Sequence, residues 1–345
     1  MSEDSVDRID FNDLNKKALS KPLVKHIYTA DPSTHVFNGK IYIYPSHDID
    51  AGEAFDDLGS HFAMEDYHVL SMDHIGGEVV DHGVALHVKD VPWAEKQMWA
   101  PDANEKDGIY YLFFPAKDYE GIFRIGVATS HSPSGPFIPQ YEAIKDSFSI
   151  DPAVFKDNDG SYYMYFGGLW GGQLQRWATG SFNADQPESP TAFIPHDREA
   201  ALLPMVAKMR NDLLEFEEKP KEIEILDENG NLLLAGDHDR RFFEAAWLHK
   251  HNGNYYFSYS TGDTHFICYA IGESPYGPFS YKGRVLNPVV GWTSHHSICK
   301  IGDKTYLFYH DSSLSKGVTH LRSVKVTEIN YLDDGTIKTI DPYSG

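Results

Sequence analysis

The sequence predicts an all-β fold, a five-bladed β-propeller. Five segments repeat one pattern, in which an apolar strand start is followed by a turn containing Gly and then by a strand rich in Tyr and Phe; they are residues 35–44, 104–113, 154–166, 248–257 and 298–308. An acidic residue or a pair of histidines also precedes each segment. A β unit that recurs at this spacing is typical of a radial array of blades.

The turns inside these segments predict tight β-hairpins. Asn38-Gly39 and Asp107-Gly108 each supply two adjacent residues that tolerate positive φ. A type I′ turn requires positive φ at both central positions, so each blade is expected to begin with two antiparallel strands. Aromatic residues make up 14% of the chain, and we expect most of them to pack between blades.

Blades one and two are assigned to residues 27–83 and 93–141, with third strands at 67–72 and 123–128. Residues 1–25 are polar and show weak helical character. We expect this N-terminal extension to wrap the outside of blade one.

Blade three begins near residue 150, and the longest departure from the repeat, residues 184–241, follows it. We interpret this segment as an excursion inserted between blades three and four, and expect it to border the pocket. Within it, residues 198–214 carry apolar side chains at helical spacing. Pro204 would end or kink such a helix.

Blades four and five complete the predicted ring. A strand at 266–270 precedes the connector 274–279, which nearly repeats the connector 132–137 of blade two. Blade five is assigned to 295–340, and how the ring closes is left open. Because five units leave little room for a second domain, residues 1–345 are expected to form a single domain.

Composition narrows the classes of partner. The net charge of −21 disfavours nucleic acid, whose phosphates require a basic surface, and disfavours anionic membrane surfaces. Two cysteines cannot build a disulfide scaffold. No signal peptide and no apolar stretch of membrane-spanning length is visible, so a cytoplasmic location is expected. A homo-oligomer is left open.

The residues before the hairpins are candidates for a site on the propeller axis. They are Asp31, Asp102, Asp151, Glu244 and the pair His295-His296. Hydrolysis of a glycosidic bond needs one carboxylic acid to protonate the leaving oxygen and one carboxylate to act on the nucleophile. Glu244 lies in an apolar, aromatic segment that would raise its pKa and suit it as the acid, whereas Asp31 is flanked by small polar residues and suits the base. Asp151 would be a third acid.

Structural explanations compete with this hypothesis. Asp before Pro often only initiates a turn, although Asp31-Pro and Asp151-Pro occupy equivalent positions in two blades. Glu244 could lie on a solvent face or pair with a nearby arginine. Asp102, which follows Trp99-Ala-Pro, could bind backbone amides near the axis.

The segments around Asp31, Asp151 and Glu244 occur together with Met98-Trp-Ala-Pro-Asp102 and Ser294-His-His-Ser297. On the basis of these segments, the chain resembles glycoside hydrolase family 43 over nearly all of residues 25–340. The resemblance implies a five-bladed propeller and an inverting enzyme. It also implies that Asp31 is the catalytic base, Glu244 the catalytic acid, and Asp151 the residue that tunes pKa and orients the substrate.

The same resemblance implies further site residues. His295 matches the position that ligates an axial divalent cation, commonly calcium, and water would fill most other positions. Arg322 matches a guanidinium that faces the sugar or a catalytic acid. Trp99 and Phe62 are candidate stacking platforms, and substrate contacts are also expected from Asp102 and His296.

The expected activity is the exo-acting, inverting release of terminal pentoses, as a β-D-xylosidase or α-L-arabinofuranosidase, from small oligosaccharides of plant hemicellulose. A non-catalytic carbohydrate-binding propeller is the alternative, and it would need the aromatic residues but not two differently placed acids. A propeller phosphorylase is a weaker alternative, because beyond Arg322 and the two histidines few side chains are available to bind phosphate.

Overall fold

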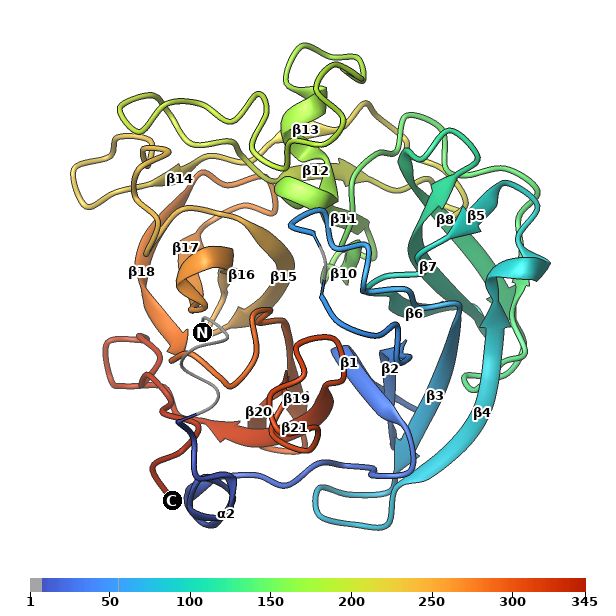
Figure 1. Ribbon diagram of the computed structural model, residues 1–345, viewed down its shortest axis with the longest axis vertical. Helices are drawn as coiled ribbons and strands as arrows, with labels where there is room; N and C mark the ends of the chain where they lie inside the picture. The colour runs from blue at the N-terminus through green and yellow to red at the C-terminus, as the bar shows by residue number, and fades with distance from the viewer. Residues whose placement is uncertain (1–7, 55) are drawn as a thin grey trace.

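A computed structural model describes residues 8–54 and 56–345. Five sheets surround a central axis, and consecutive sheets along the chain are neighbours in the ring (Figure 1). The five-bladed β-propeller predicted from the repeats is therefore confirmed. Among the described residues, no helix is long and apolar enough to cross a membrane.

Blades one and two are sheets of antiparallel strands. Blade one has the order β1-β2-β3-β4, formed by Tyr28–Phe37, Lys40–Asp48, Asp66–Met72 and Val80–His87. Blade two has the order β5-β7-β8-β9, formed by Ala94–Lys96, Ile109–Asp118, Phe123–Ser130 and Ile138–Pro139. Its remaining strand, β6 (Asp102–Lys106), also pairs with β7.

Blades three to five are also mainly antiparallel, except that β14 pairs parallel with β18 in blade four. Blade three is β10-β11-β12-β13, formed by Ala153–Lys156, Tyr162–Phe166, Met205–Lys208 and Lys221–Glu222. Blade four has the order β14-β18-β17-β16-β15, in which β14 to β18 are Ile225–Leu226, Glu244–His251, Asn254–Ser260, Ile267–Gly272 and Phe279–Leu286. Blade five is β19-β20-β21, formed by His296–Ile301, Lys304–Asp311 and Ser323–Ile329.

The hairpin turns have the predicted backbone conformation. Asn38 and Gly39 have φ values of 51° and 77°, and Asp107 and Gly108 have values of 55° and 79°. Positive φ at both central residues matches the right-handed twist of the flanking strands. The local turn chemistry therefore starts each of these blades in the expected register.

The helical interpretation of residues 198–214 is wrong. Met205–Lys208 form β12, which pairs antiparallel with β11 as the third strand of blade three. Val206 and Ala207 are fully buried in this sheet. Pairing with a strand distant in sequence therefore overrides the helical spacing. None of the described residues in 184–241 lines the central cavity, so the expected border with the pocket is also wrong.

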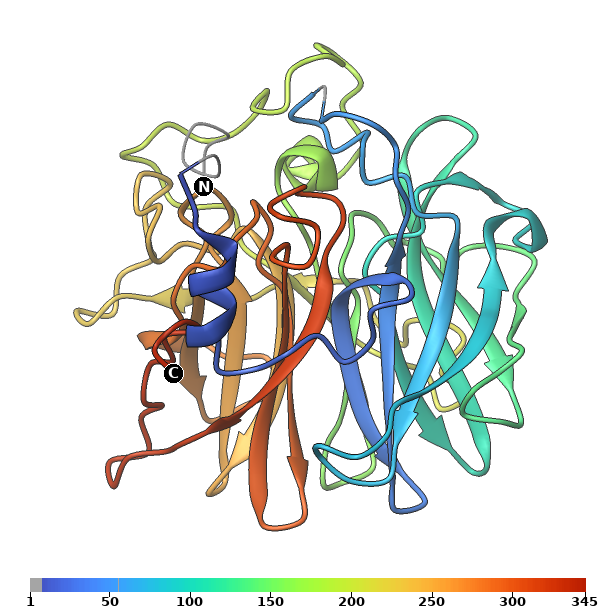
Figure 2. The same ribbon diagram turned by 60° about the horizontal axis from the view of Figure 1, so that its bottom comes forward.

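The N-terminal extension lies over the boundary between blades five and one, where Val24 packs with side chains of both blades, instead of wrapping the outside of blade one alone. Leu23 N donates to Val324 O at 2.8 Å, and Val326 N donates to Ser20 Oγ at 3.0 Å. Helix α2 (Phe11–Lys17) lies near the C-terminus, where Gly345 N donates to Lys17 O (Figure 2). The first seven residues of the predicted extension lie outside the described part of the chain. These contacts help to close the ring between its last and first blades.

Alternating side chains of each strand fill the spaces between neighbouring blades. On β2, Tyr44 packs in the cluster shared with blade two, whereas Ile41 and Ile43 pack with Phe308 and Val324 of blade five. Successive side chains of a strand point to opposite faces, so a strand with two apolar faces binds both neighbours. This packing fixes the inner strands and the residues at their ends.

Candidate active site

A cavity of about 530 Å³ opens at the centre of the ring. Every blade contributes to its lining, through Asp31, Trp99, Asp151, Glu244 and His295. Side chains separated by tens to hundreds of residues in sequence therefore meet in one compartment. The volume lies in the range of sites that hold small organic ligands.

Asp31 is positioned by an irregularity in β1. The pairing of β1 with β2 shifts register between Ala30 and Ser33, and Asp31 has φ of 48°. Bulges of this kind redirect a side chain, and strained φ values cluster at functional sites. The Asp31 carboxylate accepts hydrogen bonds from Ser46 Oγ at 2.7 Å and from Arg322 Nη1 at 2.9 Å.

The surroundings of Asp31 keep it ionised. Burial by itself raises the pKa of its carboxyl. The charges of Arg322, His295 and His310 and the hydrogen bond from Ser46 together outweigh burial and bring this pKa down to about 2. His310 also accepts the backbone N–H of Asp31 at Nδ1, at 3.0 Å. At neutral pH Asp31 is therefore a carboxylate able to accept a proton.

Glu244 begins β15 and has the opposite protonation state. Burial raises the pKa of its carboxyl to about 8, the charge of Asp31 adds to this, and Arg322 opposes it. A carboxyl group with this pKa remains mostly protonated at neutral pH. One cavity thus contains a proton acceptor and a proton donor, which is the pairing that acid–base catalysis requires.

Asp151 interacts electrostatically with both Asp31 and Glu244. It has φ of 59°, and its Oδ2 accepts the backbone N–H of Ala245 at 2.8 Å. Burial, followed by the charges of Glu244 and Asp31, raises the pKa of Asp151 well above its ordinary value. This backbone contact ties the third acid to the residue that follows Glu244, and both acids line the cavity.

Arg322 links the site to a carboxylate that sequence analysis missed. Its Nε and Nη2 donate to the two oxygens of Asp48 at 2.8 and 2.7 Å. Arg322 and Asp48 are both almost fully buried. Asp48 lies in the segment 44–50, which resembles the β-xylosidase/arabinofuranosidase branch of the family, but its role was missed because only folding brings it beside a residue 274 positions away.

His295 lines the cavity beside the acids. Its Nδ1 lies 3.5 Å from Asp31 Oδ1 and 3.9 Å from Asp151 Oδ2. Burial lowers the pKa of His295 to about 4 although Asp31 opposes the shift, so the imidazole is neutral at neutral pH and can offer a lone pair to a cation. Among residues 8–54 and 56–345, no hydrogen bond is found at its Nε2. The residue type therefore fits the predicted axial cation.

Asp102 and His296 are structural residues, which corrects their expected contact with substrate. Asp102 accepts Val154 N at 2.6 Å and lies 2.6 Å from His35 Nε2, tying blade two to its neighbours. His296 Nε2 lies 2.6 Å from Ser258 Oγ. Both side chains are buried, and neither is among the described residues that line the cavity. Strand alternation directs His295 into the cavity and His296 into the sheet.

The predicted aromatic platforms are at the cavity wall. Trp99 Nε1 donates to the backbone carbonyl of Phe62 at 2.8 Å, and the two rings meet edge to face. The Arg322 guanidinium lies 4.9 Å from the centre of the Phe62 ring. Sequence analysis missed other residues of this wall, which carry no repeated motif: His61, Phe243, Trp292 and His320.

A cavity on the propeller axis that pairs an ionised with a protonated carboxyl group provides the two groups that a glycoside hydrolase requires. Residues 79–337 match the model of Glycosyl hydrolases family 43. The chain belongs to this family, which confirms the family resemblance of its motifs.

Several relatives match over nearly their whole length. Xylosidase/arabinosidase 43A of Humicola insolens is 60% identical, covering 93% of this chain and 99% of the relative. Xylosidase/arabinosidase of Bacteroides ovatus is 56% identical, covering 94% and 98%. A family 43 β-xylosidase/α-arabinofuranosidase from a compost microbial metagenome, solved with xylotriose in a calcium-free form, is 66% identical with a TM-score of 0.92, covering 94% and 98%.

Proposed function

We propose that this protein is an inverting exo-glycosidase that releases terminal β-D-xylose or α-L-arabinofuranose from small oligosaccharides. The observation that carries this proposal is the opposite protonation of Asp31 and Glu244 in one cavity. A non-catalytic carbohydrate-binding propeller would need no such pair. The pentose assignment is supported by the names of the relatives and by the xylotriose bound to the metagenomic enzyme.

The proposed reaction is a single displacement. Glu244 donates its proton to the glycosidic oxygen as the bond to the anomeric carbon breaks. Asp31 accepts a proton from a water molecule, whose oxygen forms the new bond on the opposite face of the sugar. The products are a sugar of inverted configuration and a shortened alcohol, after which solvent returns the proton from Asp31 to Glu244.

Asp151 and Arg322 act on these two groups in the proposed mechanism. Asp151, whose pKa is raised by burial and by the charges of Glu244 and Asp31, accepts the backbone N–H of Ala245 and so helps to position Glu244. Arg322 holds Asp31 in its ionised form and in one orientation through the 2.9 Å contact. Trp99 and Phe62 at the wall would stack on a sugar face.

His295 is the proposed ligand of a divalent cation, with calcium as the first candidate. A neutral imidazole and several waters would bind it, and the cation would supply positive charge near the carboxylates. The described residues bring no set of three close metal-ligating side chains to His295, so this cation would bind weakly.

The decisive experiment measures activity and stereochemistry together. We expect hydrolysis of nitrophenyl β-D-xyloside or nitrophenyl α-L-arabinofuranoside, with NMR showing the first-formed sugar in the inverted configuration. A product of retained configuration would contradict the roles of Asp31 and Glu244. A Glu244→Ala variant with unchanged sugar binding, together with a wild type inactive on both substrates, would instead favour the carbohydrate-binding alternative.

A further inference from the structure

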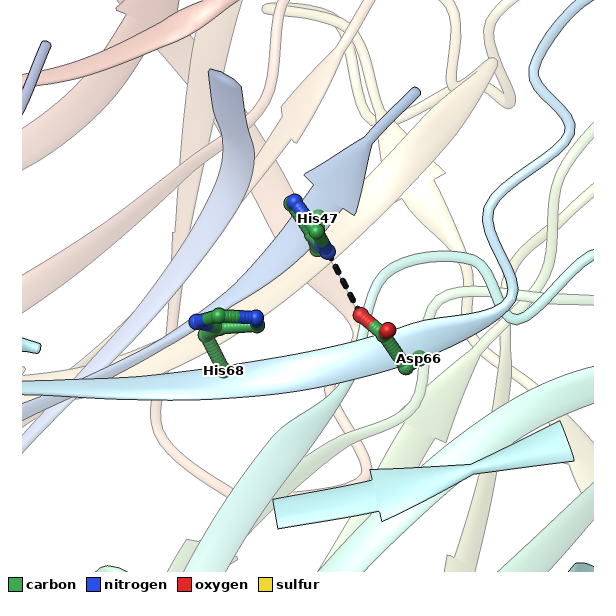
Figure 3. A group of neighbouring side chains, drawn as sticks. All are labelled: His47, Asp66 and His68. Atoms are coloured by element: carbon green, nitrogen blue, oxygen red, sulfur yellow. Dashed lines mark hydrogen bonds and ion pairs between the residues drawn. The ribbon is translucent and has the colours of Figure 1, made fainter. Parts of the chain in front are cut away.

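Three metal-ligating side chains meet outside the active-site cavity, where β2 ends and β3 begins. They are His47, Asp66 and His68. Among the described residues, this is the group of His, Cys, Asp or Glu in which one ligand atom from each of three members lies within 4.8 Å of the others. Figure 3 shows the three side chains on neighbouring strands, with the His47 ring joined to the Asp66 carboxylate.

The geometry of the group is compact. His47 Nδ1 lies 2.5 Å from Asp66 Oδ1, and the His47 and His68 rings have centroids 4.4 Å apart. The side chains of His47 and Asp66 are each 17% exposed and that of His68 is 12% exposed. The group is therefore largely shielded, yet a small ion and its water can reach it.

A second carboxylate orients His68. Asp81 Oδ1 lies 2.8 Å from His68 Nδ1, and Asp81 is itself held by the backbone N–H of Gly83 at 2.8 Å and by His26 Nε2 at 2.7 Å. A carboxylate that occupies one imidazole nitrogen fixes the tautomer and leaves the other nitrogen available to a metal. This arrangement leaves Nε2 as the ligand atom of His68.

We propose that His47, Asp66 and His68 form a binding site for a first-row transition-metal dication, zinc in the first instance. Two imidazoles and one carboxylate, with water in an open position, are a ligand set that zinc accepts. Calcium prefers six to eight oxygen ligands, so this site differs in chemistry from the cation proposed at His295. The ion would replace the hydrogen bond between His47 and Asp66.

The place of the site gives it a consequence for catalysis. His47 and Asp66 stand at the two ends of the connection between β2 and β3, and this connection contributes Leu58, Gly59 and Phe62 to the cavity wall. An ion held by both ends would tie the base of the connection together. Because none of the three ligands lines the cavity among the described residues, the acid–base groups themselves are left unchanged.

The test uses zinc chloride on the full chain after removal of metals with a chelator and dialysis. All proteins carry His295→Gln, so that zinc at the cavity histidine does not contribute. Equilibrium dialysis with elemental analysis should find tightly bound zinc in this background, and His47→Gln and His68→Gln should each lose it. His131→Gln, at an exposed histidine that is not a member of the group, is the matched control and should retain it.

Two further readouts keep the test independent of activity. Zinc should raise the Tm of the background protein by mass action, and less so in the two variants. Cobalt(II) should give the visible absorption of a low-coordinate imidazole site, absent after His68→Gln. Failure of the background protein to bind zinc, or zinc binding by the His47→Gln and His68→Gln variants as tight as that of the background protein, would overturn the proposal. Circular dichroism checks that each variant folds.

Discussion

Arg322 bridges two buried carboxylates, donating to Asp31 at 2.9 Å through Nη1 while Nε and Nη2 bind both oxygens of Asp48. The position of one guanidinium therefore connects the proposed catalytic base to the end of β2. Its positive charge lowers the pKa of Asp31 and opposes the rise in the pKa of Glu244. The pH dependence of the enzyme should report on this single side chain.

Replacing Arg322 by Gln should move the active pH range upward. Without the cation, the pKa of Asp31 and that of Glu244 both rise, so both limbs of the kcat/KM profile should shift by about one pH unit or more, each unit being about 1.4 kcal/mol. Arg240→Gln is the matched control, because Arg240 pairs with Glu228 and Asp237 away from the cavity. Limbs that stay in place in Arg322→Gln would contradict the electrostatic role.

The wild-type enzyme should lose activity as pH rises through about 8, where Glu244 ionises. The pKa of Glu244 in the folded state lies above its ordinary value of 4.5. The protonated side chain therefore contributes fully to folding stability below pH 4.5, and this contribution is lost as the pH rises through about 8. Carbon-13 NMR of labelled glutamate should show a carboxyl group titrating near that pH, missing in Glu244→Gln. Its absence from the wild-type spectrum would count against the assignment.

Glu244→Gln and Asp31→Asn should differ in how they depend on the leaving group. Both should lower kcat/KM on xylo-oligosaccharides by about 10²–10⁴-fold, the usual contribution of general acid–base catalysis. Nitrophenolate leaves without a proton, so Glu244→Gln should retain much more activity on a nitrophenyl glycoside, whereas Asp31→Asn should not. Equal losses on both substrates in Glu244→Gln would argue against its role as the acid.

Asp48→Asn should destabilise the fold. Asp48 is fully buried and Arg322 nearly so. Removing the Asp48 charge leaves the buried guanidinium with Asp31 as its remaining carboxylate partner, and we expect a cost of up to about 3–5 kcal/mol in free energy of unfolding. Urea denaturation measures this. Asp239→Asn, which breaks the exposed contact of Asp239 with Arg284 at 3.1 Å, should cost less than about 1 kcal/mol. Similar losses in the two variants would show that the buried pair is not special.

Removal of divalent cations should lower the activity of the wild type if His295 holds a functional ion. Activity should return on addition of calcium, and a His295→Ala variant, though slower, should respond neither to the chelator nor to calcium. Rates measured before and after exhaustive dialysis provide the comparison. A wild type indifferent to both treatments would remove the cation from the mechanism.

Local sequence was sufficient to predict the hairpins and the ring. Asn38-Gly39 and Asp107-Gly108 determine their turns through their own φ preferences, which is why these strands were predicted correctly. Residues 205–208 were predicted incorrectly as part of a helix, because β12 is extended through its pairing with β11. The path of the N-terminal extension depends likewise on hydrogen bonds to β21, which local composition does not encode.

The sequence by itself determined the blade repeat and, through the acids that precede four of the five hairpins, the candidates Asp31, Asp151 and Glu244. The tertiary structure alone decided that Asp102 and His296 are structural, that Asp48 anchors Arg322, and that Asp31 and Glu244 have opposite protonation states. The physical reason is that pKa depends on burial and on neighbouring charge, and the charge that keeps Asp31 ionised comes from a residue 291 positions away.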